Sequence, residues 1–141
     1  IDSELLVANV GDSRAYLYRN FQIKQLTEDH TLVQELVKSG EITEEEAKRH
    51  PQRNIVTQSL GITLNVQIDF VRVTLKNEDT ILLCSDGLSN MLEDQYIKEI
   101  LGNYSDVNTQ AQKAVLAANE AGGRDNITVA IAKYLVREEV A

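Results

Sequence analysis

The order of apolar and polar residues predicts three short strands near the start of the chain. Segments 4–10, 14–18 and 21–26 are rich in apolar residues, and the turn-forming sequence Gly11-Asp12-Ser13 separates the first two. Consecutive strands joined by such short turns pair in opposite directions. We therefore expect an antiparallel meander.

Between residues 31 and 50 the apolar spacing becomes helical. The segment TLVQELVKSG carries its apolar residues at the spacing of one helical face and ends at Gly40. A second short helix is predicted for TEEEAKRH, where Thr43 and Glu46 form a capping box and Pro51 lies just beyond the last basic residues. Two short helices in succession are expected here.

Strand patterns return for 66–75, 80–85 and 127–132. The alternation in the first of these slips by one residue at 70–71, which predicts a bulge. The other two have almost no polar face, so they need apolar cover on both sides. Helices predicted for 93–101 and 108–121 supply such cover. The expected class is α+β, with antiparallel strands sandwiched and helices outside.

Composition narrows the range of functions. The 141 residues are 43% apolar, which suits one domain or part of one. A net charge of -8 opposes nucleic-acid binding, which needs a basic surface. The sequence has no apolar run long enough to span a membrane and no basic leader, and its single cysteine, Cys84, excludes a disulfide framework. We expect a cytoplasmic protein that binds neither nucleic acid nor membrane.

Three carboxylates occupy equivalent places along the chain. Asp12, Asp86 and Asp125 each lie in or beside a turn at the end of an apolar strand. An unpaired ionised aspartate is costly to bury, so each needs a hydrogen bond, a proton or a cation. Any one of them alone is best explained as a turn residue. The three together favour a site for a hard cation such as Mg²⁺, Mn²⁺ or Ca²⁺.

Five motifs follow one another along the chain: GDSRAYL (11–17), LTEDHT (26–31), NIVTQSLG (54–61), LLCSDGLSNML (82–92) and GGRDNITV (122–129). In their order and approximate spacing they resemble the type 2C, metal-dependent (PPM) family of serine/threonine protein phosphatases, in its bacterial branch. The resemblance implies a four-layer α-β-β-α sandwich of two antiparallel sheets flanked by helices. It also implies an enzyme that hydrolyses phosphoserine and phosphothreonine in proteins and opposes a cognate Ser/Thr kinase.

The same resemblance implies which residues form the site. Asp86 and Asp125 match metal ligands, with Asp86 shared between a binuclear centre and a third site, and Asp12 matches a ligand of the third metal. The complete domain is expected to hold two to three Mn²⁺ or Mg²⁺ ions. Residues 31–51 match a flap subdomain beside the site.

The sequence also departs from the family. The early Arg and Asp motif and the Asp-Gly-x-Gly-Gly motif, which carries the bridging ligand, have no counterpart in these 141 residues. Residues 1–141 are therefore expected to be the C-terminal part of a single phosphatase catalytic domain, without its N-terminal part. We expect this chain by itself to have little or no phosphatase activity.

Two other functions fit the sequence less well. A non-catalytic pseudophosphatase or phosphoprotein-binding regulatory module is disfavoured because all three aspartates are retained. A calcium-binding domain is disfavoured because the dense acidic loop of an EF-hand is absent. Arg14 is interpreted as the partner of a carboxylate. The other polar residues near these motifs are also interpreted as structural: Arg124, His30, His50, Ser13 and Ser85.

Overall fold

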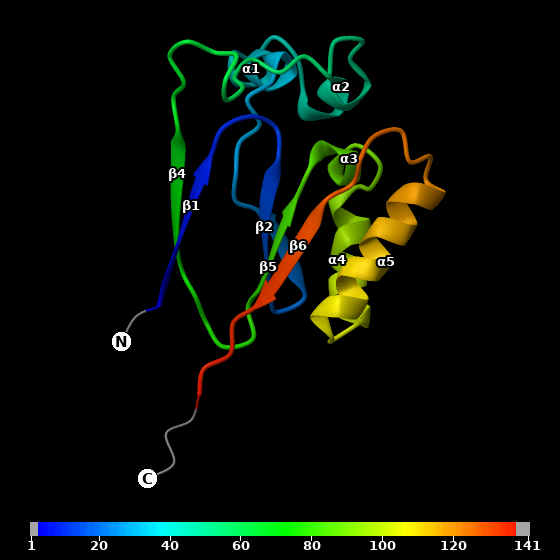
Figure 1. Ribbon diagram of the computed structural model, residues 1–141. Helices are drawn as coiled ribbons and strands as arrows, with labels where there is room; N and C mark the ends of the chain where they lie inside the picture. Colours follow the sequence, from blue (N-terminus) through cyan, green and yellow to red (C-terminus); the bar gives the residue numbers. More distant parts are fainter. Residues whose placement is uncertain (1–2, 138–141) are drawn as a thin grey trace.

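Two antiparallel sheets form the centre of the molecule in a computed structural model that describes residues 3–137 (Figure 1). A two-stranded sheet pairs β1 with β4, and a four-stranded sheet has the order β3-β2-β5-β6. The bounds are β1 (Glu4–Asn9), β2 (Arg14–Arg19), β3 (Gln22–Gln25), β4 (Asp69–Thr74), β5 (Thr80–Cys84) and β6 (Val129–Lys133). All four strand pairings are antiparallel, which confirms the predicted sheet class. The predicted three-stranded meander was wrong in part, because β2 and β3 pair as a hairpin whereas β1 pairs with β4 in the other sheet.

The helices fall into two groups. One group packs beside the four-stranded sheet, and the other lies beyond the end of both sheets (Figure 1). The first consists of α3 (Asp86–Ser89), α4 (Asp94–Asn103) and α5 (Val107–Glu120), and the second of α1 (Leu32–Lys38) and α2 (Glu44–Arg49). The predicted capping box of α2 is confirmed. The described residues thus supply two sheets and one helical layer of an α+β sandwich.

Two apolar cores lie on opposite faces of the four-stranded sheet. Tyr16 and Leu82 belong to the core between this sheet and the helices, together with Ile97 of α4. Leu17 and Ile81 belong to the core between the two sheets. Neighbouring residues of one strand therefore enter different cores, because successive side chains point to opposite faces. This explains why β5 reads as apolar on both faces. Cover on both faces was also predicted for 127–132 and was wrong there, because alternate residues of β6 remain exposed.

Two further details of the sequence prediction were wrong. The predicted bulge at 70–71 is absent, because β1 and β4 pair without interruption from Glu4↔Thr74 to Asn9↔Asp69. The phase slip arises because Phe70 is 64% exposed on the outer face rather than buried. The segment after β5 was predicted as a turn, whereas it begins the short helix α3 at Asp86.

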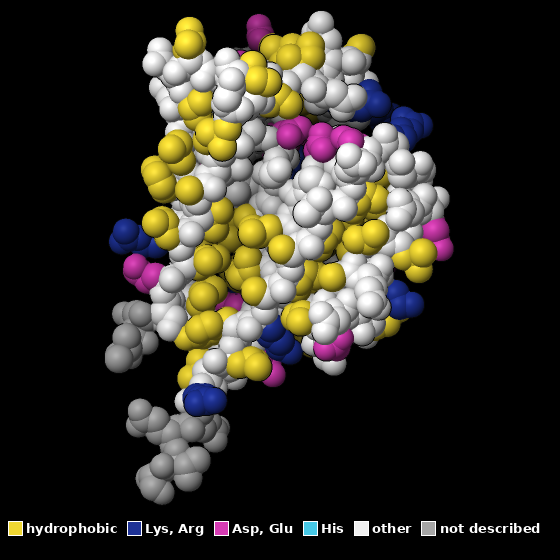
Figure 2. Space-filling view, viewed as in Figure 1, with side chains coloured by type: hydrophobic (Ala, Val, Ile, Leu, Met, Phe, Trp, Pro, Cys, Tyr) yellow, Lys and Arg dark blue, Asp and Glu magenta, His cyan; other side chains and the backbone are white. Residues whose placement is uncertain are grey.

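Apolar side chains remain exposed over both sheets. Phe70 of β4, Leu6 of β1 and Leu83 of β5 are 64%, 58% and 46% exposed. Apolar side chains spread across the sheets in the space-filling view (Figure 2). These faces are less covered than the face under α4 and α5. Within residues 3–137, none of the helices combines the length and apolar character needed to cross a membrane.

Candidate metal site

The strand register brings the three predicted carboxylates to one end of the four-stranded sheet. Cys84, the last residue of β5, lies opposite the first residue of β2 and the first residue of β6. Asp12 precedes β2, Asp86 follows β5 and Asp125 precedes β6, so all three leave the sheet at the same edge. The helices α1 and α2 lie beyond this edge, and acidic side chains gather beneath them (Figure 2).

Asp12 and Asp86 face each other at this edge. The pKa of Asp12 is raised above its ordinary value, first by burial, then by the negative charges of Asp86 and Asp29. A backbone hydrogen bond to Asp12 lowers the pKa, but it does not cancel these effects. Two carboxylates in contact repel each other when both are ionised. Such a pair is stabilised either by a shared proton or by a bound cation.

The loop that carries Asp125 is fixed against the start of α3. The Ser85 N–H donates to the Thr128 carbonyl at 3.0 Å, and the Thr128 N–H donates to Ser85 Oγ at 3.0 Å. A Cβ added at Gly87 would stand 2.1 Å from the carbonyl oxygen of Asn126, so only glycine permits this approach. The Asp125 carboxylate accepts a hydrogen bond from the Asn126 N–H at 2.7 Å.

The donors in this region fit part of a metal site. In the described part of the chain, no group of three His, Cys, Asp or Glu side chains is arranged to hold a metal ion. The two facing carboxylates of Asp12 and Asp86 offer the oxygen ligands that Mg²⁺ and Mn²⁺ prefer. The assignment of Asp12, Asp86 and Asp125 as metal ligands stays a prediction.

Arg14 is bound within a network at the same edge. Its guanidinium donates to Asp29 Oδ1 at 2.9 Å and to Asp29 Oδ2 at 2.6 Å. It also donates to the hydroxyl of Tyr16, which in turn donates to Asp94 Oδ1 at 2.8 Å. The prediction that Arg14 pairs with a carboxylate is confirmed. A bidentate pair of this kind holds the guanidinium in a fixed direction.

His30 is also held within the protein. Its Nδ1 lies 2.9 Å from the Gly11 nitrogen, and its Nε2 lies 2.7 Å from Asp69 Oδ2. His50 is the C-cap of α2, which agrees with the structural role predicted for it. Sequence reasoning missed Asp29 and Asp69 as partners. Asp29 stood beside His30 in LTEDHT, and Asp69 was the one acidic residue in the apolar alternation of 66–75, which was a usable signal.

Two potential nucleophiles near the edge are committed to structure. Burial raises the pKa of Cys84 to about 11, so its thiol is protonated at neutral pH. Ser85 Oγ accepts from the Thr128 N–H and donates to the Asn126 carbonyl at 3.3 Å. Among residues 3–137, neither side chain has a hydrogen-bonded base that would activate it. This arrangement disfavours a covalent phosphoenzyme on either residue.

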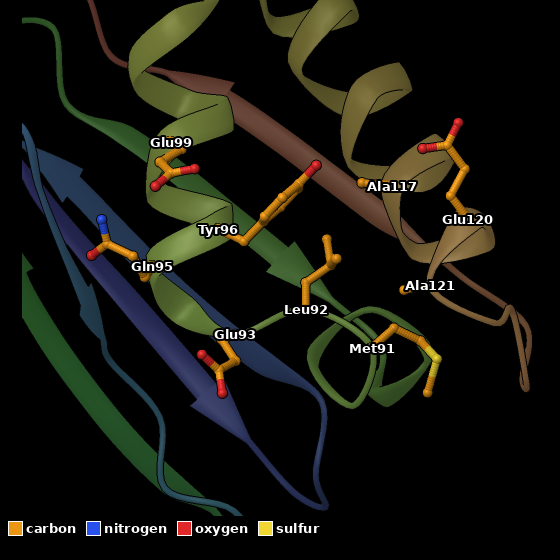
Figure 3. Close-up of a pocket in the computed structure, with 9 residues that line it drawn as sticks. All are labelled: Met91, Leu92, Glu93, Gln95, Tyr96, Glu99, Ala117, Glu120 and Ala121. Carbon is orange, nitrogen blue, oxygen red and sulfur yellow. The ribbon is translucent and has the colours of Figure 1, made fainter.

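A groove of about 510 Å³ lies elsewhere, between α4 and α5 (Figure 3). Its lining consists of Met91, Leu92, Glu93, Gln95, Tyr96, Glu99, Ala117, Glu120 and Ala121. None of the three predicted ligands contributes to it. Its acidic side chains project from the two helices around an apolar floor rather than toward a common point (Figure 3). The groove is therefore separate from the candidate metal site.

Comparison with known proteins identifies similar sequences. The family profile described as Protein phosphatase 2C matches residues 1–36. "Serine/threonine phosphatase stp" of Listeria monocytogenes is 46% identical over 127 residues, covering 90% of this chain and 50% of the relative. "Protein phosphatase PhpP" of Streptococcus pneumoniae is 47% identical over 131 residues, covering 93% of this chain and 53% of the relative. The chain spans about half the length of these curated relatives.

Solved structures share the fold. The serine/threonine phosphatase of S. agalactiae superposes with a TM-score of 0.88 at 42% identity, covering 94% of this chain and 55% of that chain. The catalytic domain of the serine/threonine protein phosphatase PstP, in complex with two manganese ions, gives a TM-score of 0.81 at 35% identity. That match covers 94% of this chain and 54% of PstP. The arrangement of sheets and helices is thus the one found in these phosphatases.

Proposed function

Because the chain belongs to the protein phosphatase 2C family, we propose that the whole protein hydrolyses phosphoserine and phosphothreonine in other proteins. The observation that carries this proposal is the pair of facing carboxylates, Asp12 and Asp86, at one edge of the sheet. A buried Cys84 with a raised pKa supports metal-dependent rather than cysteine-based hydrolysis.

Asp86, Asp125 and Asp12 are the proposed ligands for two to three Mn²⁺ or Mg²⁺ ions. Asp86 serves both the binuclear centre and a third site, and Asp12 serves the third site. Such ions lower the pKa of a water molecule and stabilise negative charge on the phosphoryl oxygens. The pair of Asp12 and Asp86 gains most from a cation because its two negative charges are otherwise in contact. The two manganese ions bound by PstP support this choice of metal.

The protein's own residues hold the site in place. Ser85 and Gly87 fix the loop of Asp125 against the start of α3. The guanidinium of Arg14 lies at the same edge, but it is paired with Asp29 and is not free to bind a phosphate group. Both features pre-organise the ligands before substrate arrives.

Residues 31–51 are proposed to act as a flap subdomain beside this edge. The absence of buried residues in α1 and α2, which are both described, supports a weakly anchored segment. The proposed substrates are phosphorylated proteins in the cytoplasm, and the proposed counterpart is a Ser/Thr kinase. A net charge of -8 supports a role apart from nucleic acids.

The test is a substitution of Asp86 in the whole protein. Asp86→Asn is expected to reduce Mn²⁺-dependent hydrolysis of a phosphothreonine peptide by about a hundredfold or more, with little loss of thermal stability. Asp106→Asn is the matched control, because Asp106 caps α5 and asparagine also serves as an N-cap. Full turnover by Asp86→Asn at saturating Mn²⁺ would contradict the proposed ligand. Absence of turnover in the unchanged protein would favour a phosphoprotein-binding module.

The 141-residue chain alone is proposed to be nearly inactive. Support comes from the described residues, which bring two carboxylates together without a third metal-binding side chain beside them. An assay with p-nitrophenyl phosphate and Mn²⁺ measures this directly. Robust turnover by the isolated chain that is lost on Asp86→Asn would refute the proposal.

A further inference from the structure

His30 is hydrogen-bonded through its ring and through its backbone. Its ring lies between Gly11 on one side and Asp69 on the other, with only 8% of the residue exposed. Its backbone N–H donates to the Gly11 carbonyl at 2.9 Å, and its own carbonyl accepts from the Thr57 N–H at 2.8 Å. The residue therefore joins three segments that are distant in sequence.

The partners of the ring define its tautomer. The backbone N–H of Gly11 is a donor, so Nδ1 of His30 must accept and carries no hydrogen. Nε2 then carries the hydrogen and donates to the carboxylate of Asp69. An aspartate thus orients the imidazole, and the imidazole orients a backbone N–H. The same logic operates where outer groups orient the ligands of a metal.

The target of this chain of hydrogen bonds is the turn that carries Asp12. Gly11 has a φ of +104°, a backbone conformation that L side chains rarely adopt, and both its N–H and its carbonyl are bound by His30. Asp12 follows directly and faces Asp86. Two facing carboxylates tend to move apart, so a rigid turn is required to keep them together.

His30 also lies at the base of the segment 31–51. The next residue, Thr31, is the N-cap of α1 and forms a β-bridge with Val56. The Leu32 N–H donates to the Ile55 carbonyl at 3.0 Å. The anchor of α1 and the anchor of the Asp12 turn are therefore consecutive residues.

We propose that His30 is a positioning residue, which holds the Gly11–Asp12 turn against the base of segment 31–51 so that Asp12 can bind a divalent cation together with Asp86. This inference rests on the proposed function, because it assumes that Asp12 is a metal ligand. His30 itself touches neither the cation nor the substrate. It acts through Gly11, and Asp69 acts through His30.

Two substitutions in the whole protein test the two ring nitrogens of His30 separately. The side-chain oxygen in His30→Asn replaces Nδ1 as an acceptor for Gly11, whereas the amide nitrogen in His30→Gln replaces Nε2 as a donor to Asp69. Asp69→Ala removes the orienting carboxylate, whose side chain is 47% exposed, and leaves the imidazole in place. His50→Asn is the matched control, because the half-buried His50 accepts from the Gln52 N–H and, within the described residues, forms no hydrogen bond with the Gly11–Asp12 turn.

Two measurements test the proposal, one of Mn²⁺ affinity and one of hydrogen exchange. Calorimetric titration with Mn²⁺ alone is expected to show the weakest site about tenfold weaker in His30→Gln, less weakened in His30→Asn and unchanged in His50→Asn. Hydrogen exchange of the Gly11 amide in the metal-free protein is expected to be about tenfold faster in His30→Gln and in Asp69→Ala. A purely structural role would affect His30→Asn and His30→Gln alike.

The results can overturn the proposal in distinct ways. Equal Mn²⁺ affinity in His30→Gln and the unchanged protein, or equal loss in both His30 variants, rejects a positioning role through Gly11. If the unchanged protein binds no Mn²⁺, the proposed function fails. Exchange of the Gly11 amide then still decides whether His30 holds the turn, and unchanged exchange in Asp69→Ala rejects it.

Discussion

The two ends of β2 each carry an arginine paired with an aspartate, yet they differ in their surplus charge. At one end Arg14 pairs with Asp29, and the further carboxylate of Asp12 lies nearby. At the other end Arg19 binds Asp79 at 2.6 Å, and the Lys76 N–H donates to the same carboxylate. At the Arg19 end one positive charge faces one negative charge. At the Arg14 end the carboxylate of Asp12 adds an excess negative charge.

The pKa values of two aspartates express this difference. Burial and the charges of Asp86 and Asp29 raise the pKa of Asp12. Burial also opposes ionisation of Asp79, but hydrogen bonds from Arg19 and from the backbone of Lys76 outweigh it, so its pKa is lowered. The balanced end is built for stability. The unbalanced end is suited to binding a cation, at a cost in stability.

The largest effect is expected from Asp79→Ala. Asp79 is 1% exposed, so its removal leaves the guanidinium of Arg19 and the N–H of Lys76 without their partner. We expect the free energy of unfolding of the whole protein to fall by about 3 kcal/mol, with Mn²⁺ affinity unchanged. Urea unfolding and Mn²⁺ titration measure the two quantities. Glu45→Ala, which breaks an exposed pair with Lys48, is the control and should have no measurable effect.

Gly87→Ala is expected to affect the opposite end. The added methyl group would stand 2.1 Å from the Asn126 carbonyl oxygen, so α3 and the loop of Asp125 must separate. We expect a loss of about 2 kcal/mol in unfolding free energy together with weaker Mn²⁺ binding. Gly102→Ala in α4 is the control. Its Cβ would meet only the side chain of Tyr18, whose hydroxyl would lie at 3.0 Å, and alanine is favoured over glycine within a helix. Unchanged metal binding in Gly87→Ala would show that the loop does not serve the site.

A smaller effect is expected in the pH dependence of stability, through Asp79 at the Arg19 end of β2. The pKa of Asp79 is lower in the folded state than in the unfolded state. Its contribution is therefore complete above the ordinary value of about 3.9 and is lost as the pH falls through the folded value. Unfolding free energies measured from neutral to acidic pH should decline below about pH 4, and less so in Asp79→Asn. Parallel curves for the two proteins would contradict this assignment.

The smallest effect is expected from Asp12→Asn without metal. Neutralising Asp12 removes its repulsion with Asp86, so the unfolding free energy should rise by about 0.5 kcal/mol while Mn²⁺ affinity falls. Thermal unfolding with and without Mn²⁺ measures both changes. A loss of stability in the metal-free protein would mean that the two carboxylates do not oppose each other.

Local patterns in the sequence predicted most of the elements. The periodicities of two and 3.6 residues located the strands and helices, and Thr43 with Glu46 marked the start of α2. Helix α3 was missed because its four residues are too few to show a period. The bulge at 70–71 was wrong because the pattern gives no sign that Phe70 faces solvent.

The sequence by itself determined that Asp12, Asp86 and Asp125 each close or open an apolar strand, because turn chemistry is local. Only the tertiary structure decided their neighbours. The register of β2, β5 and β6 set the common edge, and long-range contacts paired Asp29 with Arg14 and His30 with Asp69. Such pairings depend on how strands align in space, and a one-residue shift in register would move each side chain to the other face.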